Sequence, residues 1–182
     1  TPEKLEQVKA RLIRLNTPAS LVGLIQLNTG LRISEPTLAR LEDLVLDHEI
    51  PHLWIRKNSL TDRKTKASIR AVPLVGISLD AAKELHVRAK RLGSPWLLPQ
   101  YAKEFGGCAC SAILNKNLRP FEFRSHMFRH AFIDRLKARN DIPLPLAESI
   151  TGHGRGRTDF AVYGSVGYTL AQKLEVIQKI EL

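Results

Sequence analysis

Apolar residues recur at helical spacing through the first part of the chain. A period of three to four residues from Pro2 to Leu15 predicts an amphipathic helix, and the largely apolar residues 19–28 predict a buried one. Thr29-Gly30 ends that segment, and Ser34 can begin a third helix. The inner face of this third helix would consist of three leucines, Leu38, Leu41 and Leu44. Arg32 would then lie between two buried helices, where a charged side chain needs a partner or a function.

Two short apolar segments in the middle of the chain are typical of β-strands. They comprise residues 52–56, with Trp54, and residues 68–74, with Val72. The turn between them, residues 59–66, is polar and rich in cations. A basic hairpin tip of this kind can contact a phosphate backbone, or it can be an ordinary solvated turn.

Helical periodicity returns after these strands and continues to the end of the chain. It predicts helices at residues 78–92, 112–118, 125–139, 146–151 and 169–182. Neither an internal repeat nor a linker interrupts the pattern, so a single domain over residues 1–182 is expected. The fold class would be mainly α with a small antiparallel β-sheet (α+β).

Composition adds a strong preference for a polyanionic partner. The 182 residues include 28 Lys and Arg against 18 Asp and Glu, so the formal net charge is +10. No apolar run is long enough to span a membrane, and the chain does not open with a signal-peptide pattern. The two cysteines, Cys108 and Cys110, form no disulfide framework and suit a reducing compartment. A cytoplasmic location is therefore expected.

Candidate chemistry is concentrated in the last third of the chain. His126 and Arg129 are three positions apart, so on a helix they project from one face and can bind an anion together. Ser125, just before them, is a candidate N-cap. His153 follows a helix-stop signal, and Tyr163 lies ten residues later. A phenol beside fixed cations and imidazoles is a candidate nucleophile toward a phosphate diester.

Five segments, in this order, resemble the sequence boxes of the tyrosine recombinases, the phage-integrase family. They are Thr29-Gly30-Leu31-Arg32-Ile33-Ser34-Glu35, the stretch from Lys64 to Leu74, His126-x-x-Arg129-His130, Thr151-Gly152-His153, and Tyr163. The fourth has Thr where the family has Leu. The resemblance runs from about Ala19 to Tyr163 and implies the integrase catalytic-domain fold, shared by DNA breaking-rejoining enzymes.

The resemblance also implies a reaction and a set of catalytic groups. Tyr163 would attack the scissile DNA phosphate to give a 3′-phosphotyrosine, followed by strand exchange and religation without ATP, metal or other cofactor. The phosphate would be stabilised by Arg32, Arg129 and His153, and His126 would assist proton transfer. Lys64 would protonate the leaving 5′-oxygen; the alternative acid is Lys66, two residues later.

The partner implied by the resemblance is double-stranded DNA. Its backbone would be contacted by five basic residues, Arg63, Lys66, Arg70, Arg155 and Arg157. The protein would be monomeric when free and assemble into a tetramer on DNA, in a bacterial or phage-encoded, nucleoid-associated setting. The family's N-terminal core-binding domain is expected to be absent from this chain. The tail helix, about residues 169–182, would dock either on a neighbouring protomer or on its own core.

Three other functions are compatible with parts of the sequence. A type IB topoisomerase uses the same chemistry on one strand, although Gly152-His153 favours a recombinase. A DNA-binding module with an inactive site would need no catalytic set, yet the whole set is present. A zinc protein could use imidazoles such as His126 and His130, but Arg129 would then place a cation against the metal.

Overall fold

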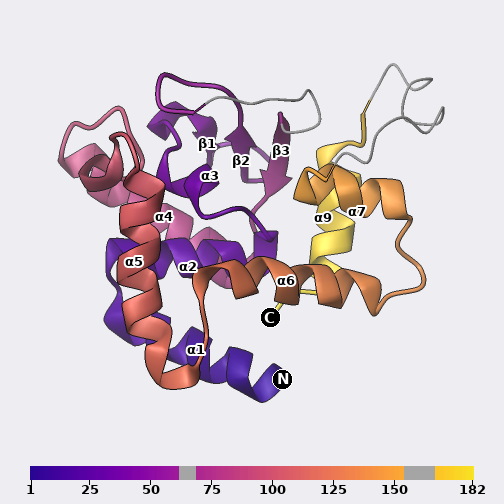
Figure 1. Ribbon diagram of the computed structural model, residues 1–182. Coiled ribbons are helices and arrows are strands. Elements are labelled where there is room, and N and C mark those ends of the chain that lie inside the picture. Colours follow the sequence, from indigo (N-terminus) through magenta and orange to yellow (C-terminus); the bar gives the residue numbers. More distant parts are fainter. Residues whose placement is uncertain (62–68, 154–166) are drawn as a thin grey trace.

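The computed structural model describes residues 1–61, 69–153 and 167–182, and helix α2 (Pro18–Thr29) runs through its centre (Figure 1). Every residue of α2 from Ala19 to Thr29 is buried. Long helices pack around it, namely α1 (Pro2–Leu15), α4 (Gly76–Arg91), α5 (Gly106–Leu118) and α6 (Ser125–Lys137). The apolar composition of this segment, which predicts a helix buried on all sides, is thus explained by neighbours around its whole circumference.

A small antiparallel sheet lies beside the helices (Figure 1). Its strands are β1 (Leu44–Val45), β2 (His52–Ile55) and β3 (Arg70–Pro73), in the order β1-β2-β3. Leu53 pairs with Val72, and both are buried. The mainly helical fold with a small antiparallel sheet is confirmed.

The helix predicted after Ser34 is wrong in length. Helix α3 covers only Ser34–Thr37, a 3₁₀ turn follows at Leu41–Asp43, and Leu44 belongs to β1. The backbone leaves the helix because it finds partners elsewhere: the Leu41 N–H donates to the Pro95 carbonyl, and the Ala39 carbonyl accepts from the Leu97 N–H. Leucines three apart can be buried by such a winding segment as well as by a helix, so their spacing was misleading.

The remaining helices match the predictions in position but differ at their ends. Helix α5 starts at Gly106, six residues before the predicted start at Ala112, and α6 starts at Ser125 with Arg124 in the N-cap position. A Cβ at Gly106 would lie 1.8 Å from the Tyr101 carbonyl oxygen, so only glycine fits there. Helices α7 (Leu144–Thr151) and α9 (Leu170–Lys179) follow in the chain and pack against each other. Among the described residues no helix is long and apolar enough to cross a membrane.

The tail helix α9 packs on its own core, against β3 and α7. Its buried residues include Val176 and Ile177, and Ile180 follows them. The side-chain amide of Asn28, at the end of α2, donates to the Leu182 carbonyl oxygen at 3.1 Å and accepts the Leu182 backbone N–H at 3.0 Å. The sequence left two dockings of the tail open, on a neighbouring protomer or on its own core, and in the structure the tail packs on its own core.

Candidate active site

The junction between α2 and α3 places Arg32 at the surface. Gly30 ends α2 with φ 62°, and a Cβ there would meet the Phe132 ring at 2.4 Å, so glycine is required for both conformation and space. The Thr29 hydroxyl donates to the Ile25 carbonyl at 2.7 Å, which holds the last turn. The side chain of Arg32 emerges from this turn and is 45% exposed.

The buried carboxylate of Glu35 pairs with Arg32. Glu35 Oε2 accepts the Arg32 backbone N–H at 2.8 Å, and its Oε1 lies 3.4 Å from the Arg32 guanidinium. The Glu35 side chain is fully buried. Burial alone would raise the pKa of Glu35, but the charge and hydrogen bonds of Arg70, with those of Arg32, outweigh it and lower that pKa. The carboxylate is therefore ionised and keeps Arg32 paired.

Arg70 completes this cluster from strand β3. Its guanidinium donates to Glu35 at 2.9 and 3.1 Å, and its Nε donates to the Ile150 carbonyl at 2.7 Å. The Arg70 side chain is only 3% exposed. The prediction that Arg70 contacts the DNA backbone does not agree with this position, since its donors are already bound inside the protein. Arg70 instead links three elements, α3, β3 and α7.

Arg129, on α6, joins the end of α2 to the end of α7. Its Nη1 donates to the Gly30 carbonyl and its Nη2 to the Thr151 carbonyl, both at 2.7 Å. Nη2 also lies 3.1 Å from Nδ1 and 3.2 Å from Nε2 of His153. Burial, followed by the like charge of Arg32, lowers the pKa of Arg129 to about 10, so the group stays charged at neutral pH.

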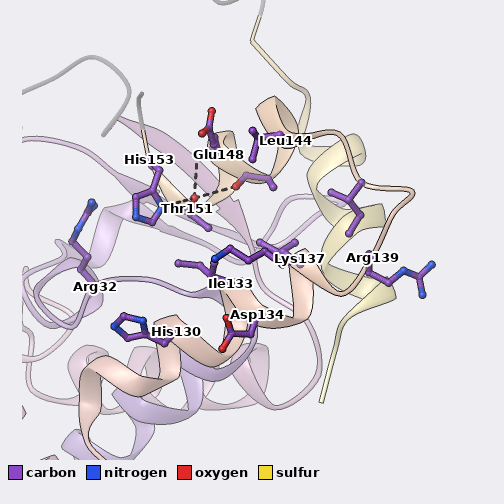
Figure 2. A pocket seen from close by; sticks show the side chains of 14 residues that line it. Arg32, His130, Ile133, Asp134, Lys137, Arg139, Leu144, Glu148, Thr151 and His153 are labelled. Atoms are coloured by element: carbon purple, nitrogen blue, oxygen red, sulfur yellow. Dashed lines mark hydrogen bonds between the residues drawn. The ribbon is translucent and has the colours of Figure 1, made fainter. Parts of the chain in front are cut away.

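Arg32, His130 and His153 line one cleft of about 600 Å³ between α6 and α7 (Figure 2). Figure 2 shows these three side chains around one end of it, with Ile133 and Leu144 along the rest of its length. The structure therefore brings groups from the α2–α3 junction, α6 and the end of α7 to one cleft, and two of them, Arg32 and His153, belong to the predicted catalytic set.

His126, the other histidine of α6, lies next to the cleft-lining His130. His126 is exposed and its ring meets that of His130 edge to face, with centroids 5.6 Å apart. His126 and His130 are one helical turn apart, as the sequence implied. In the part of the chain that the structure describes, no group of three or more His, Cys, Asp or Glu side chains could hold a metal ion.

Several predicted residues lie outside the described ranges, and the structure says nothing of them. They are the candidate nucleophile and acid, and four of the five candidate DNA contacts: Tyr163, Lys64, Arg63, Lys66, Arg155 and Arg157. Conversely, sequence reasoning gave no role to Glu35 and misassigned Arg70. A carboxylate three residues after a motif arginine was the available signal for Glu35, because i, i+3 pairs meet on a helical turn.

Comparison with known families decides the classification. The sequence model of the phage integrase family matches residues 2–167 of the chain. The chain belongs to the phage integrase family. No curated protein matches it. Membership of this family identifies the chain as a DNA-binding, tyrosine-recombinase type of protein with a role in site-specific DNA recombination or integration.

In this phage-integrase family protein, the described part of the site presents cationic donors at one opening. The guanidinium of Arg32 is partly exposed, and Arg129 lies behind it with two of its donors fixed on backbone carbonyls. His153 stands next to Arg129 and is exposed. Fixed charged donors of this kind stabilise negative charge that develops on a phosphate, because they need little reorganisation when the charge appears.

Proposed function

We propose that this protein cuts and rejoins DNA strands through a covalent 3′-phosphotyrosine at Tyr163. The observation that supports it best is the meeting of Arg32 and His153, from separate elements, at one cleft, with Arg129 in contact with His153. The phenol attacks the phosphorus, and the bond from phosphorus to the 5′-oxygen of the next nucleotide breaks. That 5′-hydroxyl, or one from another strand, then attacks the phosphotyrosine, which restores a DNA phosphodiester and releases the tyrosine. The phosphotyrosine conserves the phosphodiester bond energy, so neither ATP nor metal is needed.

The arginines are suited to the transition state of this reaction. An arginine side chain keeps its charge at any working pH, and planar guanidinium groups can each hold two phosphate oxygens. In the DNA-free structure Arg129 donates to the carbonyls of Gly30 and Thr151, which fixes its orientation. His153 then hydrogen-bonds a phosphate oxygen, and His126 assists proton transfer.

Lys64 protonates the leaving 5′-oxygen in this proposal, with Lys66 as the alternative acid. The two can be distinguished by a DNA substrate with a 5′-bridging sulfur, which leaves without a proton. Removing the true acid should slow cleavage of normal DNA by roughly 10²–10⁴-fold and should scarcely affect the sulfur substrate. Rescue of Lys66→Ala but not of Lys64→Ala would reassign the acid.

Double-stranded DNA is the partner, and exchange of strands requires assembly of several protomers. We propose a monomer in solution and a tetramer on DNA, with backbone contacts from Arg63, Lys66, Arg155 and Arg157. The basic net charge of +10 supports the DNA contacts.

The decisive experiment traps the covalent intermediate. The protein is incubated with a nicked suicide DNA substrate in excess EDTA, and the adduct is digested and mapped by mass spectrometry. We expect the phosphopeptide to contain Tyr163, and Tyr163→Phe to bind DNA and form no adduct. Tyr168→Phe is the matched control, because Tyr168 lies five residues away and should not be needed.

Two results would contradict the proposal. An adduct that persists in Tyr163→Phe would assign the nucleophile elsewhere, and cleavage that requires added magnesium would exclude the metal-free mechanism. Relaxation of supercoiled DNA without any strand exchange would indicate a type IB topoisomerase instead.

A further inference from the structure

The end of helix α7 contains a hydroxyl where the family motif has an aliphatic side chain. Thr151 stands in the Thr-Gly-His segment and is 3% exposed. Its Oγ1 lies 3.1 Å from the Ala147 carbonyl oxygen, 3.4 Å from that of Glu148 and 3.0 Å from Nδ1 of His153. Leucine could make none of these bonds. The position therefore offers a contact to His153 that the family motif does not predict.

The protons of this group can be assigned from the chemistry of its partners. A backbone carbonyl only accepts, so the single hydroxyl proton of Thr151 is directed to the carbonyls of Ala147 and Glu148. The oxygen of the hydroxyl is then left to accept from His153. This requires a proton on Nδ1 of His153.

Arg129 is compatible with this tautomer but does not select it alone. Its Nη2 lies 3.1 Å from Nδ1 and 3.2 Å from Nε2 of His153, and a guanidinium has donors but no acceptor. With Nδ1 protonated toward Thr151, the lone pair that can accept from Arg129 belongs to Nε2. One tautomer therefore satisfies Thr151, His153 and Arg129 together.

We propose that Thr151 is a positioning residue that fixes the Nδ1–H tautomer and the ring orientation of His153, so that Nε2 is the unprotonated ring nitrogen of this cleft-lining residue. Figure 2 shows the Thr151 side chain between α7 and the His153 ring. The carbonyl of the same residue accepts from Arg129 at 2.7 Å. Thr151 thus orients two of the groups that surround the phosphate, one through its side chain and one through its backbone.

The consequence for the reaction rests on the function proposed above. A phosphate oxygen accepts hydrogen bonds, so Nε2 must gain a proton before it can donate to one. Because Nδ1 already carries a proton directed to Thr151, the added proton can enter only at Nε2, which then no longer accepts from Arg129. The negative charge of bound DNA favours this protonation, and the hydroxyl of Thr151 determines where it occurs.

The tautomer can be measured in the DNA-free protein, without any assumption about activity. Two-bond ¹H–¹⁵N correlations of the histidine rings, recorded where the rings are neutral, distinguish protonated from unprotonated nitrogens. The signal lost in His153→Gln identifies His153. We expect an Nδ1–H ring in the wild type and in Thr151→Ser, which retains the hydroxyl. In Thr151→Val, which has nearly the same shape, the Nε2–H form should gain population.

Either of two NMR results would overturn the assignment: an Nε2–H ring in the wild type, or a Thr151→Val spectrum identical to that of the wild type. Thermal unfolding of each variant, measured in parallel, shows whether the fold is intact. A variant that is not folded is replaced in the comparison by Thr151→Ala.

A kinetic cycle separates positioning from mere structural support. Thr151→Val should slow formation of the Tyr163 adduct by about tenfold or more when His153 is present, similar to the loss of groups that orient metal-bound imidazoles, and Thr151→Ser should restore the rate. In a His153→Gln background the same substitution should have no further effect. An equal loss in both backgrounds would refute the positioning role. If the wild type forms no adduct, the proposed function fails, and the NMR measurement alone decides the tautomer.

Discussion

At the scale of single residues, the site depends on the guanidinium of Arg129, which binds backbone carbonyls and also contacts His153. Arg129 donates to Gly30 at the end of α2 and to Thr151 at the end of α7. A planar fork can reach two carbonyls in different directions, whereas an ammonium group is a single point. The same side chain that would bind phosphate therefore also sets the distance between the two segments that carry Arg32 and His153.

Replacing Arg129 by Lys should lower the rate of adduct formation by about 10²–10³-fold, because one fixed donor to the phosphate is lost. The measurement is a single-turnover assay on the suicide substrate. Arg135→Lys is the matched control: Arg135 also donates to backbone carbonyls, those of Leu27 and Ile180, whereas Arg129 is the one that contacts His153. That variant should lose stability and keep its rate. An unchanged rate in Arg129→Lys would show that the fork has no catalytic role.

The sequence was informative about residues whose chemistry is tied to a local motif. Arg32, Arg129 and His153 each stand in a short recognisable segment, and the structure places all three at one site. Arg70 could not be identified in this way, because its partners Glu35 and Ile150 are distant in the chain and meet it only in the folded protein. A basic residue beside a cation-rich turn looks like a surface residue until the sheet is seen to bury it.

At the scale of elements, the Glu35–Arg70 pair joins α3, β3 and α7 inside the protein. Both side chains are buried, at 0% and 3% exposure, and each makes several hydrogen bonds. Removal of one partner would leave the other as an uncompensated buried charge, which is more costly than the pair itself is favourable. The leucine pattern after Ser34 shows the limit of sequence reasoning at this scale. It predicted which side chains are buried but gave the wrong element.

Arg70→Met should lower the free energy of unfolding by about 3–5 kcal/mol, since Glu35 would be left buried without its main partner. Urea unfolding followed by circular dichroism measures this. Arg139→Met is the control, because the ion pair of Arg139 with Asp141 is exposed and should contribute little. A loss in Arg70→Met no larger than that in the control would contradict the structural role of the buried pair.

The pH dependence of stability should report the same pair through Glu35. The folded-state pKa of Glu35 is lowered, so its stabilising effect is present above the unfolded-state pKa of about 4.3 and is lost as the pH falls through the lower folded-state value. In Glu35→Gln this part of the acid destabilisation should disappear, and stability near neutral pH should already be reduced. Urea unfolding at several pH values from neutral downward tests it, with the exposed Glu49→Gln as control. Parallel pH curves for wild type and Glu35→Gln would contradict the assignment.

At the scale of the whole molecule, the C-terminal segment closes the fold upon itself. Ile177 and Ile180 are buried against the core, Lys173 donates to the Ala71 carbonyl at 3.1 Å, and Asn28 holds Leu182. The apolar pattern of the tail predicted a helix with a buried face. It could not say which surface buries that face, because an apolar stripe fits the chain's own core and that of a neighbour equally well.

Ile177→Ala should destabilise the isolated protein by about 2–5 kcal/mol, as expected for loss of a fully buried aliphatic side chain. Thermal or urea unfolding of the monomer measures the effect. Leu144→Ala is the matched control, since Leu144 is 63% exposed and should change stability little. A silent Ile177→Ala would mean that the tail leaves its own core in solution.

The burial of α2 has a consequence for how the site can open. Backbone amides surrounded by α1, α4, α5 and α6 exchange with solvent hydrogen only when the whole protein unfolds, so α2 belongs to the slowest-exchanging unit. This helix ends at Thr29-Gly30, where the carbonyl of Gly30 binds Arg129 and the chain turns to Arg32. Arg32 and Arg129 are thus attached to the unit that unfolds last. Their spacing should persist through every partial opening of the protein, and heat should abolish it only at the temperature of global unfolding.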